Sequence, residues 1–477
     1  MMHGFETRGL FVPRGRFGTT GRFGRMFPEL RSFRDFDPAA FGRVGGPMDG
    51  GSPPPPDTSQ NNPRIRAGYT FLGQFIDHDL TLDTTSVLEQ QVDVEATHNF
   101  RTPAFELDSL YGLGPAVQPY IYDLSKPFRF LLSNNGNDLP RNSDGRALIG
   151  DPRNDENIIV SQLHLLMLKF HNRVFETEFP PDAPVNQARF EATQRIVRWH
   201  YQWLILNEFL PRICGTNLVR RMVSSPTFQF PDVPFMPVEF SVAAYRFGHS
   251  QTRPGYGINS KGGGALLFPA DPTDITSQTL RGFRPVPENL VVDWARFFGP
   301  GPGAQDSKKI DTLLSTSMLR LPDGVVPPQT PDNRRSLAIR NLQRGIDVSL
   351  PSGQDVAAAL GISNPLTEQE IWTSNGQPIG SGPAPLWFYC LREGEVRASG
   401  RRLSGVGAVI VAQTFIALML ADKASYLAQM PNWKPTLGKN GRFTASDLVN
   451  YTLGLSNDQT LPSEDLASLG GDDTADA

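Results

Sequence analysis

Hydrophobic residues recur at the spacing of an α-helix in four segments, which are residues 157–179, 190–215, 405–430 and 444–454. The first segment, NIIVSQLHLLMLKFHNRVFETEF, places its apolar residues at helix-compatible intervals, so one side of this helix should be buried. The second helix should stop at Pro211 and Gly215, and the third at Pro431. The fourth is short, with threonine or serine available to cap its first turn.

Long proline- and glycine-rich stretches separate these segments, at residues 224–238, 252–274 and 296–335. The sequence shows no regular alternation typical of strands and no repeat with a period of roughly 20 to 50 residues. We therefore predict a mainly α-helical fold: a single large helical domain with long ordered loops. Loops of this length usually wrap a core or shape a site.

The N-terminal part of the chain differs in composition from the rest. Residues 1–45 are rich in arginine, glycine and phenylalanine, and GRFG occurs at both 15–18 and 21–24. A tetraproline at Pro53–Pro56 must be extended. The arm could contact an anionic surface, but we favour the simpler interpretation that it wraps its own domain. We predict three regions, which are an extended arm and linker (1–65), the helical domain (66–460) and a flexible acidic tail (461–477).

Charge and cysteine content limit the classes of partner. The chain of 477 residues has a formal net charge of -4 and a pI of about 6.0, which gives no reason to expect binding to nucleic acid or acidic membranes. Two cysteines, Cys214 and Cys390, allow at most one disulfide. Because no apolar signal segment precedes Pro13, we expect a cytoplasmic protein, with leaderless secretion as the alternative.

The longest apolar run, residues 405–421, predicts a buried core helix. Its sequence, GVGAVIVAQTFIALMLA, contains Gln413 and Thr414 and is shorter than the roughly 20 residues that span a bilayer. We therefore expect no transmembrane segment. The sequence leaves the oligomeric state open.

The motif GQFIDHDL at residues 73–80 concentrates polar side chains on a predicted helix. Gln74 and His78 are four residues apart and share one face, whereas Asp77 and Asp79 point about 100° to either side of His78. A surface turn with solvated acids would explain the motif in isolation. The His-Asp pair also occurs in metal phosphohydrolases, but it is a weak signal without their partner histidine and aspartate.

Four further segments follow in order: TPAFELDSLYG (102–112), DPRNDEN (151–157), YRFGHS (245–250) and NLQRG (341–345). Together with GQFIDHD they resemble the animal-type haem peroxidases of the peroxidase–cyclooxygenase superfamily, over roughly residues 66–435. Each motif is short, but five in the same order and spacing are specific. The resemblance implies a haem b cofactor. It also implies reduction of hydrogen peroxide, followed by oxidation of halide, pseudohalide or small aromatic donors through an oxoferryl species, and a role in the response to oxidative stress.

On one side of the haem, the resemblance implies that His249 binds the iron. Neutral imidazole is a common axial ligand, and its second ring N–H needs an acceptor that fixes the tautomer. Asn341 matches the family residue in that role. Arg246 and Arg344 match arginines near the haem propionates, where cations offset two carboxylates.

On the opposite side, the resemblance implies that His78 moves a proton. Cleavage of the peroxide O–O bond needs a base that takes a proton from one oxygen and returns it to the other. Arg153 matches the arginine that stabilises charge on the leaving oxygen, and Gln74 would hydrogen-bond distal water or a halide. Three other histidines on apolar helix faces are interpreted as structural, namely His164, His171 and His200.

Asp77 and Glu156 match the two carboxylates that form esters with haem methyl groups in mammalian members of the family. Covalent attachment and simple hydrogen bonding without an ester are the two alternatives for this chain. Asn157 stands where some members carry the methionine of a third, sulfonium link, so we do not expect that link.

The resemblance also implies a calcium ion behind the helix, since Ca²⁺ prefers hard oxygen ligands. Its implied ligands are Asp79, Thr102, the carbonyl of Ala104, Glu106 and Asp108. Other members carry aspartate and serine at the positions of Glu106 and Asp108, so the ion could be shifted here. A salt-bridged loop without calcium is the alternative.

Two alternative functions stay open. Fatty-acid dioxygenases of the superfamily use a radical on a tyrosine three residues before the proximal histidine, where this chain has Arg246. Tyr245 is one residue further back, and the rotation of about 100° on a helix should turn it away from the channel, which favours a peroxidase. A haem protein with a structural or adhesion role is the second alternative, although the sequence shows no repeat module typical of that role.

Overall fold

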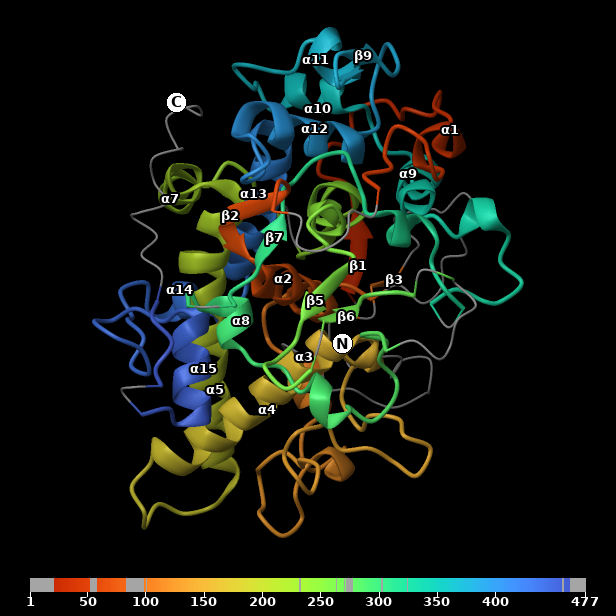
Figure 1. Ribbon diagram of the computed structural model, residues 1–477. Coiled ribbons are helices and arrows are strands. Elements are labelled where there is room, and N and C mark those ends of the chain that lie inside the picture. The colour runs from red at the N-terminus through yellow and green to blue at the C-terminus, as the bar shows by residue number, and fades with distance from the viewer. Residues whose placement is uncertain are drawn as a thin grey trace.

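The computed structural model describes most of the chain between residues 21 and 463. The described residues are 21–51, 58–82, 98–99, 101–230, 233–262, 264–269, 271, 278–301, 303–323, 325–456 and 459–463. Helices dominate this part of the chain and its strands are short (Figure 1), which confirms the predicted mainly α-helical class. The tetraproline and most of the predicted acidic tail lie outside the described residues.

The long helices are α2 (Ala67–Leu80), α4 (Ile158–Thr177), α5 (Gln187–Leu204), α9 (Leu337–Asp347), α12 (Leu386–Ala398) and α13 (Gly405–Ala421). The shorter α-helices are α1 (Pro38–Gly42), α3 (Asp108–Tyr111), α6 (Leu210–Cys214), α7 (Thr216–Ser224), α8 (Ala295–Phe298), α10 (Gly353–Ala359), α11 (Glu368–Trp372), α14 (Tyr426–Gln429) and α15 (Ala445–Leu453). Two π-helical stretches are η4 (Ile205–Phe209) and η5 (Glu239–Ala243). Among the 3₁₀ turns, η3 (Pro152–Asp155) and η6 (Ala244–His249) carry predicted site residues.

The strands are β1 (Gly21–Gly24), β2 (Asn61–Arg66), β3 (His98–Asn99), β4 (Met236–Pro237), β5 (Gly255–Gly257), β6 (Gly264–Leu266), β7 (Asp306–Lys308), β8 (Thr373–Ser374) and β9 (Gln377–Pro378). β1 lies between β3 and β4, antiparallel to the first and parallel to the second. The pairs β2–β7, β5–β6 and β8–β9 form two-stranded ribbons. These ribbons tie loops to the helical core rather than forming a core of their own.

The described part of the N-terminal arm packs on the helical domain. β1 joins the three-stranded sheet, and α1 packs against α9. The buried Glu239 carboxylate accepts hydrogen bonds from the backbone N–H groups of Met26 and Phe27 at 2.9 and 3.2 Å. These contacts agree with an arm that wraps its own domain, while the division into three regions stays a prediction.

The helix predicted at 190–215 does not stop at Pro211. α5 continues into the π-helical stretch η4 and then into α6, so the backbone stays helical as far as Cys214. Pro211 lies directly after the junction of η4 and α6, so its missing N–H falls at an irregularity of the helix rather than within regular α-helix. The helix ends at Gly215, whose φ of 93° suits glycine.

The helix predicted at 405–430 is shorter than expected. α13 ends where Asp422 turns the chain and accepts a hydrogen bond from the backbone N–H of Ala424 at 2.8 Å. Ser425 then caps the separate helix α14, so the predicted stop at Pro431 is wrong. Most residues of α13 are buried, which confirms its interpretation as a core helix. Among the described residues, no helix is long and apolar enough to cross a membrane.

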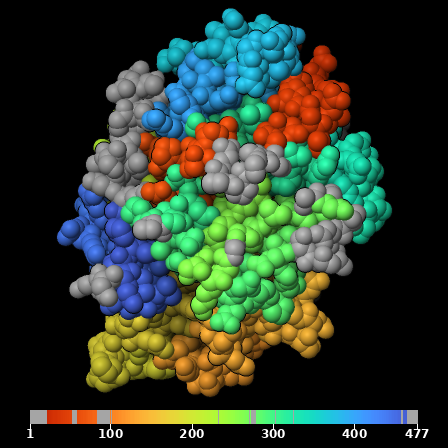
Figure 2. All heavy atoms as spheres, viewed as in Figure 1, coloured from red at the N-terminus to blue at the C-terminus, as the bar shows by residue number. Residues whose placement is uncertain are grey.

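α2 lies near the centre of the molecule and carries the GQFIDHDL motif (Figure 1). It packs against α4, α8 and η6, and most of its residues are buried. At Gly68 an added Cβ would lie 2.5 Å from the Phe298 ring, so α8 could not approach as closely with a larger residue there. In the view of Figures 1 and 2, the segment around β5 and β6 lies in front of α2.

Candidate active site

A cavity of about 860 Å³ is lined by residues of α2, η6 and the segment that follows η3. This volume lies within the range of about 300 to 1,000 Å³ that is typical of ligand sites. Its wall brings together eight of the predicted haem-site residues, which are Gln74, Asp77, His78, Arg153, Glu156, Arg246, His249 and Arg344. The predicted proximal and distal histidines therefore face one cavity.

The predicted distal histidine, His78, is tied to a second histidine through an asparagine. Its Nδ1 lies 2.8 Å from Asn154 Oδ1, and Asn154 Nδ2 lies 2.9 Å from His164 Nδ1. An amide oxygen only accepts, so His78 Nδ1 carries the proton and its Nε2 is left as an acceptor. Sequence reasoning missed Asn154 and interpreted His164 as structural only. The available signal was the position of Asn154 directly after Arg153 in DPRNDEN.

Burial keeps His78 neutral. Desolvation, with the nearby charge of Arg153, lowers the pKa of His78 to about 3. Its Nε2 lies 3.6 Å from Glu156 Oε1, and burial raises the pKa of Glu156 to about 7. Gln74 Nε2 donates to the same carboxylate, and Asn157 Nδ2 donates to Gln74 Oε1 at 3.2 Å. The distal wall therefore holds a neutral base beside a carboxyl group that is itself hydrogen-bonded.

Arg153 is fixed by a buried aspartate. Its Nη2 lies 2.8 Å from Asp151 Oδ2 and donates to the backbone carbonyl of His78 at 3.0 Å. Although burial opposes ionisation, Arg101 and Arg153 hold the pKa of Asp151 well below its usual range. The Arg153 side chain remains 25% exposed. The guanidinium of Arg153 therefore lies beside His78, and its ion pair with Asp151 fixes its position.

The predicted proximal histidine, His249, shares one side of η6 with Arg246, because residues three apart align in a 3₁₀ helix. Its Nδ1 lies 2.7 Å from Asn341 Nδ2, and Asn341 Oδ1 accepts a hydrogen bond from Arg246 Nη1 at 2.5 Å. Burial, followed by the charge of Arg246, lowers the pKa of His249 to about 3. The result is a neutral imidazole in contact with the amide predicted from the sequence.

Tyr245 lines the cavity, so the expectation that it turns away from the channel is wrong. The prediction assumed a rotation of about 100° per residue, as in a regular α-helix, but η5 is π-helical and η6 is a 3₁₀ turn, so the side chains point in other directions. The Tyr245 hydroxyl donates to the backbone carbonyl of Gly73 at 3.1 Å. Its ring stacks on Phe240 with centroids 4.6 Å apart.

Asp77, the other predicted ester carboxylate, lies on the α2 side of the cavity wall. Thr81 Oγ1 donates to its Oδ1 at 3.2 Å. Burial raises the pKa of Asp77, an effect opposed by the charges of Arg153 and Arg246. Asp77 and Glu156 therefore both face the space that a prosthetic group would fill.

Behind α2, the predicted calcium ligands form a buried acidic cluster. Asp79 Oδ2 accepts a hydrogen bond from the Leu107 backbone N–H at 3.2 Å, while Oδ1 has no hydrogen-bond partner among the described residues. Asp108 forms an ion pair with Arg101 at 2.8 Å. Burial raises the pKa of Asp79, and the charges of Asp108 and Glu106 raise it further. The cluster thus holds more carboxylates than Arg101 alone can neutralise.

The loop itself is closed by short backbone bonds. The carbonyl of Thr102 accepts from the Ala104 N–H at 2.8 Å, and the carbonyl of Ala104 accepts from the Glu106 N–H at 3.0 Å. Burial raises the pKa of Glu106, although the charge of Arg198 opposes this. In the part of the chain that the structure describes, no group of three His, Cys, Asp or Glu side chains is already arranged as a metal cage.

Comparison with known proteins shows the family to which the chain belongs. Residues 125–377 match the family described as animal haem peroxidase. This range is more than half of the chain, and the chain belongs to the animal haem peroxidase family, which confirms the resemblance found in the sequence. The matched range contains Arg153, His249 and Asn341, whereas His78 lies before it.

The curated relatives include proteins from several animals that are named as peroxidases or as peroxidase-like. The chain is 30% identical over 219 residues to a peroxidase-like protein of Margaritifera margaritifera, which is 42% of this chain and 26% of that protein. It is 24% identical over 304 residues to heme peroxidase 2 of Caenorhabditis elegans, which is 58% of this chain and 40% of that protein. For chorion peroxidase of Drosophila melanogaster the identity is 28% over 243 residues, which is 48% of this chain and 28% of that protein. The matches therefore span between about a quarter and two-fifths of these relatives.

Solved structures with the same fold include a peroxidase and a fatty acid dioxygenase. Peroxidase A from Dictyostelium discoideum gives a TM-score of 0.61 at 17% identity, with 91% of each chain covered. A fatty acid alpha-dioxygenase from Arabidopsis thaliana gives 0.53 at 15% identity, with 89% of this chain and 71% of that chain covered. Both similarities concern the fold alone, because identities this low do not carry an activity.

The residues present fit the haem that the family implies. A neutral imidazole, His249, and a neutral base, His78, face the same cavity. Arg246 and Arg344 add two cations to the wall, as a group with two propionates requires. The volume and the donor chemistry therefore agree with an enclosed iron porphyrin.

Proposed function

We propose that the protein is a haem peroxidase, which reduces hydrogen peroxide and oxidises halide, pseudohalide or small aromatic donors. The observation that carries this proposal is the neutral, buried His78, whose Nδ1 is fixed by Asn154 and whose Nε2 is left as an acceptor in a cavity shared with His249. Bound haem would supply the iron that binds peroxide and holds the oxidising equivalents. The purified protein should show a Soret band and consume peroxide only when a donor is present. A colourless protein with bound metal ions would contradict the proposal.

On the distal side, the chain's own groups handle one proton and one developing charge. His78 Nε2 would take a proton from one oxygen of the peroxide and return it to the other, which leaves as water. Asn154 keeps the imidazole in the tautomer that this transfer requires. Arg153, fixed by Asp151, stabilises the negative charge that grows on the leaving oxygen. Gln74 orients water or a small anion beside them.

On the proximal side, His249 would hold the iron through Nε2. That bond requires its Nδ1–H to donate, and the Asn341 amide, which contacts Nδ1 at 2.7 Å, would supply the acceptor through its oxygen. Arg246 and Arg344 on the cavity wall would bind the propionates.

Asp77 and Glu156 are the proposed points of covalent haem attachment. After turnover with peroxide, wild-type haem should resist extraction into acidified organic solvent, because an ester survives the acid that breaks the iron–histidine bond. The D77N/E156Q double variant should release its haem completely. Absorbance of the organic phase measures the difference. Complete extraction of wild-type haem after turnover would exclude an ester.

Calcium binding by the loop behind α2 is also proposed. The support is the buried Asp79 Oδ1 without a described partner, together with the carboxylates of Glu106 and Asp108 nearby. We expect Ca²⁺ to raise the melting temperature by about 2 to 4 °C relative to a chelator, because a ligand that binds only the folded state stabilises it. D79N should abolish this difference. Equal melting curves for the wild type with calcium and with chelator would favour the salt-bridged loop held by Arg101.

A fatty-acid dioxygenase is the second candidate, because Tyr245 lines the cavity and the fold resembles that of a fatty acid alpha-dioxygenase. We favour the peroxidase because the Tyr245 hydroxyl is bound to the Gly73 carbonyl. Y245F should therefore change the rate of donor oxidation by less than about twofold. Oxygen uptake with linoleate that disappears in Y245F would instead identify Tyr245 as the radical site.

A further inference from the structure

Two arginines on the cavity wall have no part in the proposed proton transfer. Arg281 and Arg284 both line the cavity; Arg281 is exposed and Arg284 is partly buried. Among the described residues, no carboxylate forms an ion pair with either side chain. Burial, followed by the charge of Arg281, lowers the pKa of Arg284, as expected for adjacent cations without an anion between them.

The segment that carries these arginines is fixed against the distal wall. The Gly282 N–H donates to the carbonyl of Glu156 at 3.0 Å, and the Phe283 N–H donates to the carbonyl of Asp155 at 2.7 Å. A side chain at Gly282 would overlap the Asp155 carbonyl, so only glycine allows this approach. Phe283 adopts a φ of 55°, a conformation that is rare for a bulky residue and is retained where the surroundings enforce it.

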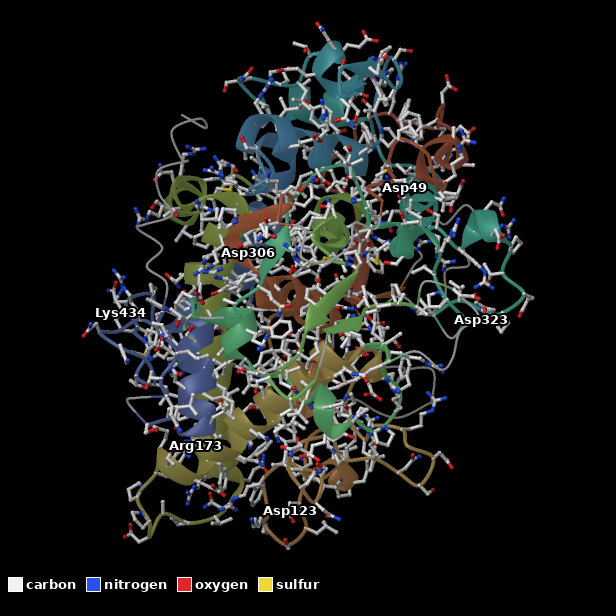
Figure 3. All side chains as sticks on the ribbon, viewed as in Figure 1. Asp49, Asp123, Arg173, Asp306, Asp323 and Lys434 are labelled. Carbon is white, nitrogen blue, oxygen red and sulfur yellow. The ribbon has the colours of Figure 1, made fainter. Side chains whose placement is uncertain are left out.

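Backbone groups orient the Arg284 guanidinium. Its Nε donates to the carbonyl of Arg281 at 3.1 Å, and its Nη2 donates to the carbonyl of Thr279 at 2.8 Å. These bonds leave part of its five-donor fork for another acceptor. Asp323 (labelled in Figure 3) also lines the cavity, but its carboxylate already accepts a hydrogen bond from Arg335 at 2.8 Å.

We propose that Arg281 and Arg284 bind the carboxylate of an organic anion whose apolar body enters the cavity. Guanidinium groups match carboxylates in shape and charge, and the wall also offers apolar surface from Leu267, Phe268 and Met318. A halide is too small to use both features. The proposal rests on the proposed peroxidase function, because the bound anion is the electron donor.

A phenol that carries a carboxylate chain meets both requirements. Its carboxylate remains at the arginines while its ring lies on the apolar wall. One hydrogen peroxide takes one electron and one proton from each of two phenol molecules, which yields two water molecules and two phenoxyl radicals. The carboxylate is unchanged by the reaction, so it serves in recognition alone.

The test compares hydroxyphenylpropionate with its methyl ester, two phenols that differ in charge at the chain end. Binding to the resting haem protein is followed by the change in Soret absorbance, and KM and kcat are measured with peroxide. In the R281Q/R284Q variant, the dissociation constant and KM for the acid should rise by about tenfold or more, while those for the ester and kcat for both stay the same. The matched control is R220Q/R221Q, which removes two exposed arginines of α7 outside the cavity wall.

Each outcome decides the proposal. The proposal would be overturned if R281Q/R284Q lost affinity equally for the acid and the ester, or lost none for the acid. It would also be overturned if R220Q/R221Q lost as much affinity for the acid. A wild-type protein that binds the acid no more tightly than the ester would also overturn it. If the wild type oxidises no donor with peroxide, the proposed function fails, whereas binding to the resting protein still decides the role of the two arginines.

Discussion

Replacing His78 by alanine or glutamine should slow the reaction of the haem-loaded protein with hydrogen peroxide by about 10²- to 10⁴-fold, the range of general acid–base catalysis. Its imidazole is neutral because burial, with the charge of Arg153, lowers its pKa to about 3. Asn154 holds Nδ1–H, so the Nε2 lone pair remains available in the cavity. Glutamine keeps polar contacts but cannot take up a proton. Stopped-flow absorbance in the Soret region measures the rate.

The matched control is His171→Gln. His171 is also a buried histidine with a pKa lowered by desolvation, but it contacts Tyr111 and does not line the cavity. Its loss should lower stability without slowing the peroxide reaction of the protein that remains folded. An unchanged peroxide rate in both His78 variants would show that another group takes the proton.

The pH dependence follows from the direction of the His78 shift. A lowered pKa means that the imidazole stays unprotonated until the pH falls toward about 3. Glu156, whose pKa is raised to about 7, lies 3.6 Å from His78, so the test uses the E156Q variant, in which that carboxyl group is removed. The peroxide rate of E156Q should stay level between about pH 8 and pH 5. A fall in this variant with a midpoint near the ordinary histidine value of 6.5 would contradict the buried, neutral assignment of His78.

Replacing His249 by glycine should cost the protein most of its haem, with an affinity loss of about tenfold or more, because the axial ligand is removed. His249 meets the requirements of that ligand, since it is neutral, lines the cavity and contacts Asn341 through its other ring nitrogen. The ratio of Soret to protein absorbance after reconstitution measures haem retention. Added imidazole should restore binding by occupying the space that the side chain leaves.

The control for this loss is His78→Ala, which removes a histidine from the opposite wall and should retain haem. A His249→Gly protein with full haem content and an unchanged Soret band would show that the iron ligand lies elsewhere. Rescue by imidazole separates a missing ligand from a misfolded protein, because imidazole cannot restore a fold.

Two of the four predicted helices and most of the predicted residues of the cavity wall agree with the structure. The period of apolar residues predicted α4 and α15 nearly to their ends, and in the structure the side chains of Asn157 and Thr444 cap their first turns. Short motifs in a fixed order predicted that GQFIDHDL and YRFGHS would meet, and the structure places both on one cavity. The roles assigned to these residues stay predictions until they are tested.

Local irregularity explains what the sequence did not reveal. A π-helical stretch carries the chain through Pro211, and another shifts the register so that Tyr245 reaches the cavity, yet no pattern of residue types signals either one. The contact of His78 with Asn154 joins residues 76 positions apart, and hydrogen bonds of this kind depend on how helices pack. The same holds for Asp108, whose pairing with Arg101 could not be read from a motif of possible calcium ligands.

The most direct test of peroxidase function measures two reactions of the same haem-loaded protein side by side. One assay follows the oxidation of bromide, iodide, thiocyanate and phenols by hydrogen peroxide, and the other follows oxygen uptake with linoleate in the absence of peroxide. We expect turnover in the first assay that depends on both peroxide and donor, and no oxygen uptake in the second. Oxygen uptake with linoleate, without any donor oxidation by peroxide, would contradict the peroxidase assignment.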